Sequence, residues 1–210
     1  MAKSNADHVD FQKDDVELID KEVPFKGYFS VEKYTVRHKT PEGAWTKPIA
    51  REIFERGHAS GMLPYDPVKD VVVLIEQFRP GAYAAGYCPW LLEVPAGIIE
   101  AGQTPEEVAR RETLEETGCT AKRIDFIADY LVSPGGSTET MHLYCVEVDA
   151  DEAFETGGLE EEGEHISVIK VSSAEAFARL ENGQIHNSTS MIALQWLKIH
   201  IDNIREKWCC

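Results

Sequence analysis

The chain has 210 residues, of which 43% are hydrophobic and 28% charged, and its formal net charge at pH 7 is −16. This composition is that of an ordinary globular protein, long enough for one well-packed domain and a small appendage. The negative charge argues against nucleic acid or an anionic membrane as a partner, and no apolar run approaches the roughly 20 residues that a membrane-spanning helix needs.

The N-terminal third of the chain is predicted to form β-strands, because apolar and polar residues alternate there. Residues 16–22 and 28–38 show this pattern and have an apolar, partly aromatic face. Further strands are predicted at residues 49–58, 71–79, 124–132, 141–148 and 166–171. Turns are predicted at residues 64–67, 80–81 and 134–136, where proline and glycine interrupt the pattern.

Helices are predicted at about 105–117, 173–182 and 188–207. The first has clear boundary signals: Thr104 suits the N-cap, Pro105 the first turn, Glu107 completes a capping box, and Gly118 suits a left-handed C-cap. The last is amphipathic. Because strands outnumber helices and do not alternate with them, the sequence predicts an α+β fold in which helices flank a mixed sheet.

Three carboxylates share one face of the first helix, since Glu112, Glu115 and Glu116 are spaced i, i+3, i+4. A solvated acidic face is the more common interpretation of such a helix taken alone. Val108 and Ala109 lie one turn earlier on the same face, which indicates that it is packed. Clustered hard oxygen ligands are what Mg²⁺ requires, and bound cations would also attract a polyanionic substrate to an acidic protein.

The stretch from Gly97 to Gly118 resembles the Nudix box, a pattern of Gly, five residues, Glu, seven residues and Arg-Glu-x-x-Glu-Glu-x-Gly. The matching positions are Gly97, Arg111, Glu112, Glu115, Glu116 and Gly118. Gln103 departs from the pattern, because the family has its first glutamate there. The resemblance links this position to orienting Arg111, and the amide oxygen of Gln103 could still accept a hydrogen bond from that arginine.

Nearly the whole chain is similar to the bacterial ADP-ribose pyrophosphatases of the Nudix superfamily. The similar segments are residues 51–58, 73–77, 89–93, 133–136 and 192–197, and Pro134, sixteen residues beyond Gly118, matches a proline that marks this branch. The resemblance implies a Nudix α/β/α sandwich with a mixed sheet for residues 48–210, including the C-terminal helix. It also implies an N-terminal antiparallel β segment, residues 1–47, that mediates homodimerisation and contacts the substrate.

The same resemblance implies a metal site for Mg²⁺, or Mn²⁺ in its place, with more than one ion. The implied ligands are the backbone carbonyl of Ala96 and the carboxylates of Glu112, Glu116 and Glu164, with Glu115 as an alternate ligand. By position Glu162 resembles the catalytic base of the family. The acidic run around it would be a solvated loop if taken alone, yet a mobile acidic loop can deliver a base to the attacking water.

The resemblance also implies substrate-binding residues, which come from several parts of the chain. They are Tyr28, Phe29, Arg51, Glu52, Arg56, Arg79, Ile98, Ser133, Pro134, Gly135 and Glu139. The arginines are expected to hold the phosphates, the aromatic pair to stack on adenine, and Glu139 to bind ribose hydroxyls. Surface ion pairing of Arg51 and Arg56 on their strand, and core packing of the two aromatic residues, are the alternatives.

Hydrolysis of ADP-ribose to AMP and ribose 5-phosphate is the activity that the resemblance implies. Two alternatives stay open: a pyrophosphatase for another nucleoside diphosphate sugar or dinucleotide, and a catalytically silent ADP-ribose sensor. The three helix carboxylates argue against a sensor. The polar N-terminus has no secretion signal and the five cysteines include no CxxC pair, so a cytoplasmic protein with reduced thiols is expected.

Overall fold

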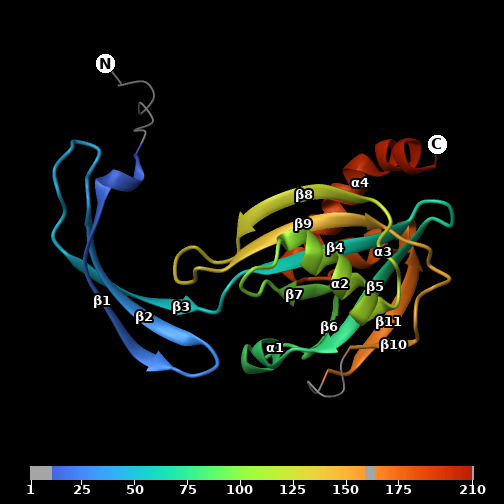
Figure 1. Ribbon diagram of the computed structural model, residues 1–210, viewed down its shortest axis with the longest axis horizontal. Helices are drawn as coiled ribbons and strands as arrows, with labels where there is room; N and C mark the ends of the chain where they lie inside the picture. The colour runs from blue at the N-terminus through green and yellow to red at the C-terminus, as the bar shows by residue number, and fades with distance from the viewer. Residues whose placement is uncertain (1–10, 159–163, 210) are drawn as a thin grey trace. The chain divides into compact units, whose positions relative to one another are not determined.

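The computed structural model describes residues 11–158 and 164–209 of the chain (Figure 1). The chain forms two compact units. The first contains the residues up to Arg56 together with Ser133–Glu139, and the second contains Gly57–Val132 and the residues from Thr140 onward. The first unit is therefore discontinuous in sequence.

The first unit is built on a three-stranded antiparallel sheet. Its strands are β1 (Val16–Lys26), β2 (Ser30–His38) and β3 (Ile49–Glu55), in the order β1-β2-β3, after a short 3₁₀ helix η1 (Lys13–Asp15). Every residue of the edge strand β1 is exposed. Within the described part of this unit no hydrophobic side chain is fully buried. The predicted N-terminal antiparallel sheet is confirmed.

The second unit contains an eight-stranded mixed sheet. Six strands follow the order β10-β11-β5-β4-β9-β8: β10 (Thr156–Gly157), β11 (Ile166–Ser172), β5 (Val71–Phe78), β4 (Ala59–Asp66), β9 (Thr140–Glu147) and β8 (Ile124–Leu131). The short strand β6 (Trp90–Glu93) pairs with β5, and β7 (Ala96–Ile98) pairs with β4. The β4–β9 pair is parallel, whereas its neighbours in the sheet are antiparallel.

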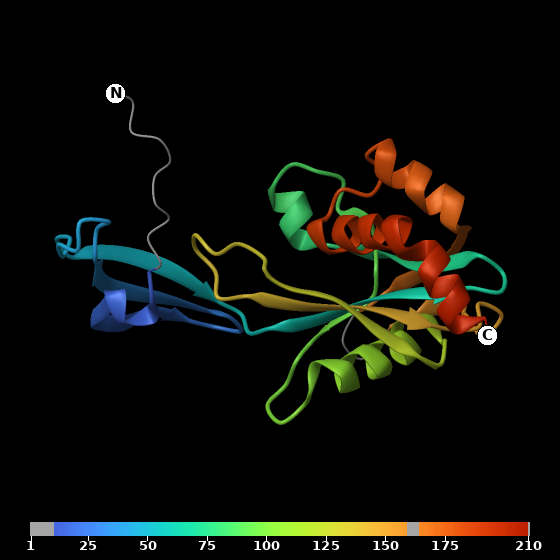
Figure 2. The same cartoon turned by 90° about the horizontal axis from the view of Figure 1, so that it is seen from above.

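Helices cover both faces of this sheet (Figure 2). They are α1 (Pro80–Ala84), α2 (Pro105–Thr117), α3 (Ser173–Glu181) and α4 (Ser188–Trp208). Ala109 of α2 belongs to a core cluster on one face, and Leu194 and Leu197 of α4 belong to the larger cluster on the other. The expected α+β sandwich is thus confirmed. None of the helices in the described chain has the length and apolar character to span a bilayer.

Strand β4 is the central element that the sequence patterns missed. All eight of its residues are buried, so the apolar–polar alternation of a half-exposed strand is absent. Gly61 and Pro64 also lie inside it, and both residues usually mark turns. The turn predicted at residues 64–67 was therefore misplaced: the chain turns at residues 67–70, where Asp70 has a positive φ of 56°.

Two other predictions near the sheet were wrong in detail. The strand predicted at residues 49–58 ends at Glu55, and a new strand begins at Ala59. The turn predicted at Pro80 and Gly81 is the first turn of the short helix α1, which proline favours because its fixed φ suits that position. The predicted turn at residues 134–136 is present.

Candidate functional site

Helix α2 begins and ends at the residues that the sequence predicted. The Thr104 hydroxyl accepts a hydrogen bond from the Glu107 backbone N–H at 3.3 Å, and the Glu107 carboxylate accepts one from the Thr104 N–H at 2.8 Å. Gly118 ends the helix in the left-handed region with φ 77°. These local contacts fix the register of α2, and the register decides which carboxylates face the sheet.

The box glutamates differ sharply in their surroundings. Glu116 is only 3% exposed, and its Oε2 accepts a hydrogen bond from the backbone N–H of Ala96 at 3.0 Å. The Glu112 side chain is 12% exposed and lies 2.9 Å from the Arg111 guanidinium. Glu115 is more open and pairs with Arg111 at 2.8 Å. The packed face inferred from Val108 and Ala109 is confirmed, since both are fully buried.

Burial makes the two inner carboxylates difficult to ionise. It raises the pKa of Glu116 to about 8, and the negative charges of Glu112 and Glu164 add to this effect. The Ala96 N–H and the charge of Arg79 lower the same pKa only in part. Burial is also the main reason why the pKa of Glu112 is raised, although Arg111 opposes the shift. The folded chain therefore brings more negative than positive charge close to these two carboxylates.

This donor set fits a hard divalent cation. Glu112, Glu116 and Glu164 influence one another's charge, and a cation among them would relieve the repulsion and the cost of burying anions. Within residues 11–158 and 164–209, no three acidic, thiol or imidazole side chains already converge at chelating distance. The oxygen donors are therefore of the chemical kind that a hard divalent cation prefers.

Gly97 lies where the backbone of β7 passes very close to Glu112. A Cβ at residue 97 would be 1.8 Å from Glu112 Oε1 and 2.6 Å from its Cγ. Any larger side chain must therefore displace this carboxylate, which explains physically why the box begins with glycine. From the sequence, Gly97 was identified only as a matching position of the box, without a structural role.

We predict that Gly97→Ala lowers turnover by about ten- to a hundredfold, because small misplacements of a reacting or ligating group cost that much. The fold should persist, since Gly97 does not have a positive φ. Turnover of the wild type and variant, together with circular dichroism, would check this. Gly81→Ala is the matched control, because a Cβ there meets nothing within 4 Å. Unchanged turnover in Gly97→Ala would contradict the proposed placement of Glu112.

Gly157 packs against the backbone of α2 at Glu116, the second of the two inner glutamates. A Cβ on Gly157 would lie 2.0 Å from the carbonyl oxygen of Glu116, and Gly158 N–H donates to the Glu115 carbonyl at 3.2 Å. These contacts join the C-terminal turn of α2 to β10. They also satisfy a carbonyl that the helix itself leaves without a partner.

Gly157→Ala is expected to destabilise the protein by about 1–3 kcal/mol, the usual cost of overpacking, because a backbone oxygen cannot rotate away. Urea unfolding followed by tryptophan fluorescence would measure this loss, with Gly81→Ala again as the control. A midpoint equal to that of the wild type would show that β10 can move away from α2 without cost.

Arg79 lies at the end of β5 and forms an ion pair that sequence reasoning did not foresee. Its Nε donates to Glu93 Oε2 at 2.5 Å, and 37% of its side chain stays exposed. The positive charge of Arg79 also lowers the pKa of Glu116. Glu93 belongs to a segment noted for its family resemblance, and the signal that could have identified it is an acidic residue ending an apolar strand.

Gln103 and Ile98 lie in the loop and strand before α2. The Gln103 carbonyl oxygen accepts a hydrogen bond from the Glu100 N–H at 3.1 Å. Arg111 instead contacts Glu112 and Glu115, so the expected bond from Arg111 to Gln103 is not among the contacts seen in the described chain. Ile98 lies in β7, half-buried, opposite Ala59 of β4.

In the first unit, Phe29 is at the centre of an aromatic and cationic group. Its ring centroid is 4.7 Å from that of Tyr28 and 5.2 Å from that of Phe54, and the Arg56 guanidinium carbon lies 5.5 Å from it. Arg56 Nη1 donates to Glu139 Oε1 at 2.6 Å. Arg56 Nε is buried and has no hydrogen-bond partner in the described residues. Tyr28 is 88% exposed, so it does not pack in a core.

The remaining expected substrate residues of this unit are exposed. Arg51 and Glu52 lie on β3, and Arg51 Nη1 donates to the carbonyl of its neighbour Ala50 at 2.8 Å. The exposed turn formed by Ser133, Pro134 and Gly135 is followed by Gly136, whose carbonyl accepts a hydrogen bond from Phe54 N–H at 2.8 Å. The structure therefore groups Tyr28, Phe29, Arg56 and Glu139, while Arg51, Glu52 and the turn are open to solvent.

The acidic run proposed to hold the base lies mostly outside the described residues. Glu162 is one of these, as are residues 159–161 and 163. Glu164 is described: it is half-buried, and its charge raises the pKa values of both Glu112 and Glu116. Of the residues expected from this run, the structure therefore places only Glu164, beside the box carboxylates.

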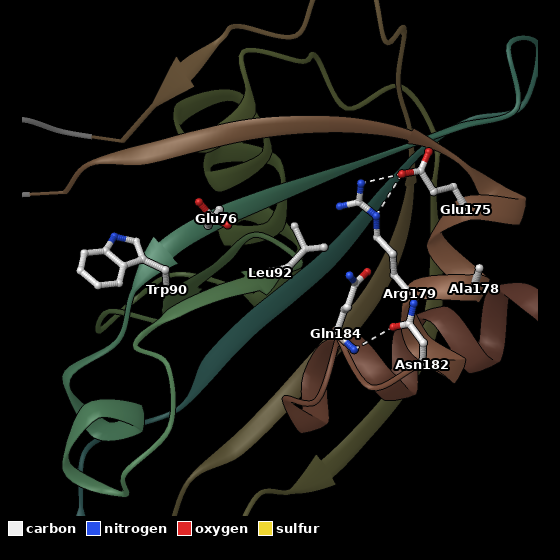
Figure 3. A pocket seen from close by; sticks show the side chains of 8 residues that line it. All are labelled: Glu76, Trp90, Leu92, Glu175, Ala178, Arg179, Asn182 and Gln184. Atoms are coloured by element: carbon white, nitrogen blue, oxygen red, sulfur yellow. Dashed lines mark hydrogen bonds and ion pairs between the residues drawn. The ribbon is translucent and has the colours of Figure 1, made fainter.

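A pocket of about 550 Å³ lies on the opposite side of the sheet (Figure 3). Its lining comes from β5, β6, α3 and the residues after α3: Glu76, Trp90, Leu92, Glu175, Ala178, Arg179, Asn182 and Gln184. Arg179 is held by Glu175 at 2.5 Å across one helical turn. None of the expected site residues lines this pocket, so its size does not make it the catalytic site.

Comparison with known proteins agrees with the box and with the fold. Residues 55–191 match the NUDIX domain. The chain is 46% identical over 200 residues to the ADP-ribose pyrophosphatase of Escherichia coli (strain K12), covering 95% of this chain and 96% of that protein. It is 36% identical over 201 residues to the Haemophilus influenzae ADP-ribose pyrophosphatase, covering 94% and 93%.

More distant similarities broaden this picture. A GDP-mannose pyrophosphatase of Yersinia pestis is 34% identical over 186 residues, covering 88% of this chain and 92% of that protein. The fold is similar to that in a crystal structure of an ADP compounds hydrolase, with a TM-score of 0.69, 19% identity, and coverage of 93% of this chain and 97% of that chain. At this identity the structural likeness concerns the fold alone.

Proposed function

Because the chain belongs to the Nudix hydrolase family, we propose that it hydrolyses ADP-ribose to AMP and ribose 5-phosphate with Mg²⁺ or Mn²⁺. The observation that carries the proposal is the half-buried Glu112 beside the buried Glu116, two carboxylates of the box helix whose charged forms are disfavoured by burial. The similarity to ADP-ribose pyrophosphatases over 95% of the chain supports the choice of substrate.

The proposed metal ligands are the carboxylates of Glu112, Glu116 and Glu164 and the backbone carbonyl of Ala96, for more than one ion. When bound, the cations would neutralise the charge of the diphosphate. The charge of Arg79 acts on Glu116 and its side chain is 37% exposed, which supports a role for this arginine in binding phosphate oxygens. Glu162 is proposed to take the proton from the attacking water.

Residues of the first unit are proposed to bind the rest of the substrate. Tyr28 is almost fully exposed beside Phe29, and such an aromatic pair suits stacking on adenine. The buried Nε of Arg56 lacks a partner in residues 11–158 and 164–209, which supports a role for this arginine in holding an anion. Glu139, which is buried against Arg56, is proposed to accept hydrogen bonds from ribose hydroxyls.

A homodimer is part of the same proposal. On strand β1 the side chains of Val16, Leu18, Ile19, Val23 and Phe25 are 46% to 60% exposed. A small antiparallel sheet needs a covered apolar face to be stable, and a second copy of the strand would provide one.

We predict that Leu18→Asp combined with Val23→Asp gives a monomer in light scattering, whereas Glu22→Gln leaves the dimer intact. A monomeric wild type would contradict this.

The decisive experiment is hydrolysis of a substrate panel with Mg²⁺ by the purified wild type. We expect kcat/KM for ADP-ribose to exceed that for GDP-mannose and for dinucleotides by at least about tenfold, the effect of a single well-placed contact. A preference for GDP-mannose would favour the alternative suggested by the Yersinia pestis relative. Binding of ADP-ribose without turnover would identify a sensor.

We expect the enzyme to act in the cytoplasm, where the free Cys88, Cys119, Cys145 and Cys209 would stay reduced.

A further inference from the structure

Gln77 is a buried polar residue whose side-chain carbonyl lacks a partner among the residues that the structure describes. The residue is 7% exposed, and its Oε1 forms no hydrogen bond within the described part of the chain. A buried acceptor without a donor costs about 1–3 kcal/mol, and such groups are rare in native proteins. The described residues therefore supply no donor that would explain an amide at this position.

The side chain of Gln77 points to the face of the sheet that carries α2. Along β5, Val73 packs in the cluster that contains Ala109 of α2, whereas Val72 and Leu74 pack in the cluster on the opposite face. Alternation along a strand then puts Gln77 and Arg79 on the same face as Val73. The register with both neighbouring strands runs through this part of β5 without a bulge.

Groups of the candidate metal site flank Gln77 on either side. On β6, Leu91 is its direct partner, and Glu93, which binds Arg79, lies two residues further along the strand. On β11, its partner is Ile166, which follows Glu164 by two residues. Gln77 therefore has the Arg79–Glu93 ion pair on one side and, on the other, the start of β11, which Glu164 precedes by two residues. It lies on the face of the sheet that α2 and Glu116 cover.

We infer that Gln77 is a positioning residue of the metal site: its side-chain carbonyl accepts a hydrogen bond from a water molecule that coordinates the divalent cation. This inference rests on the proposed function, because it needs a cation among Glu112, Glu116 and Glu164. Mg²⁺ keeps several of its waters when proteins bind it, and those waters need acceptors. A neutral amide accepts such a bond without adding another charge to a crowded acidic site.

Glu76, the next residue along β5, provides a control within the same strand. It points to the other face, where it lines the pocket together with Trp90 and Leu92 (Figure 3). A substitution of Glu76 therefore changes β5 at almost the same position along the strand. It removes a charge but leaves the surroundings of Gln77 unchanged.

The test is titration of Mg²⁺ into nucleotide-free protein by calorimetry, combined with thermal melting of the metal-free protein. The variants are Gln77→Met, which keeps an unbranched side chain without the carbonyl, and Glu76→Gln. For Gln77→Met we expect Mg²⁺ affinity to fall about 10- to 100-fold, as for other outer-shell partners of metal ligands. Its metal-free melting temperature should equal or exceed that of the wild type, because an unpaired buried acceptor is gone. Glu76→Gln should bind Mg²⁺ like the wild type.

Gln77→Glu completes the set, since it restores an acceptor and is expected to keep or raise Mg²⁺ affinity. Wild-type affinity in Gln77→Met would overturn the inference while leaving ADP-ribose hydrolysis by the wild type, and hence the proposed function, untouched. A lower metal-free melting temperature with unchanged affinity would overturn it as well, by assigning Gln77 to the fold. If the wild type binds no divalent cation and does not hydrolyse ADP-ribose, the proposed function fails first.

Discussion

Replacing Glu116 by glutamine is expected to lower turnover by at least about a hundredfold at saturating Mg²⁺, the scale seen when one main electrostatic contact of an active site is removed. Glu116 is 3% exposed and its Oε2 is fixed by the Ala96 N–H. An amide of the same shape keeps the volume but loses the charge that attracts a cation. Glu112→Gln should behave similarly, because its carboxylate belongs to the same cluster.

The same substitution should stabilise the metal-free protein, and the pH dependence of this gain can be derived. The pKa of Glu116 is about 8 in the folded protein against an ordinary value of 4.5. Between these values the unfolded chain releases the proton and the folded protein retains it. The stability contributed by this group is therefore fully present below pH 4.5 and is lost as the pH rises towards 8, by about 1.4 kcal/mol per pH unit.

Melting temperatures of metal-free wild type and Glu116→Gln should therefore coincide near pH 4.5 and diverge up to pH 8, with the variant higher. Mg²⁺ should raise the melting temperature of the wild type and have little effect on the variant. Glu106→Gln, an exposed change on the same helix, serves as the control for charge alone. Near-normal turnover together with an unchanged pH profile would remove Glu116 from the metal site.

Glu162→Gln is expected to lower turnover by roughly 10²–10⁴-fold while affinity for ADP-ribose is retained, as for the loss of a positioned general base. The loss is expected at Glu162 specifically, although this residue belongs to a run in which several glutamates have similar chemistry. Glu160→Gln and Glu161→Gln should be nearly neutral, since only one side chain can reach the attacking water. Glu164→Gln should instead raise the Mg²⁺ requirement, because its charge acts directly on Glu112 and Glu116.

Single-turnover hydrolysis at several Mg²⁺ concentrations, with binding measured separately, would distinguish these roles. If another glutamate of the run carries the loss, the position taken from the family resemblance is wrong for this chain. If none of them matters, the base lies elsewhere, and Glu115 becomes the first candidate because it is the most open of the three box glutamates.

Helix α2 could be predicted almost residue by residue because its signals are local. The cap at Thr104, the glycine at residue 118 and the spacing of the box carboxylates all act within a few positions of one another. The α+β class followed from the number and spacing of strands. Strand β4 could not be recognised, because complete burial removes the alternation on which strand prediction depends.

The missed site residues share a different physical cause. Three features depend on which strand lies beside which: the Arg79–Glu93 pair, the close approach of Gly97 to Glu112, and the Gln77 carbonyl, which has no partner in the described part of the chain. Strand neighbours and their register are set by long-range packing, and one sequence does not encode them in any short pattern. The family resemblance supplied Arg79 but gave no reason to single out its partner.

The discontinuity of the first unit has a consequence for biosynthesis. The three strands β1 to β3 can pair as soon as they leave the ribosome, yet Phe54 bonds Gly136, and Arg56 bonds Glu139, which is 83 residues further along the chain. The contacts at the C-terminal end of β3 thus remain incomplete until most of the protein has been translated. During that interval β1, through which we propose that the dimer forms, is already available to other nascent chains.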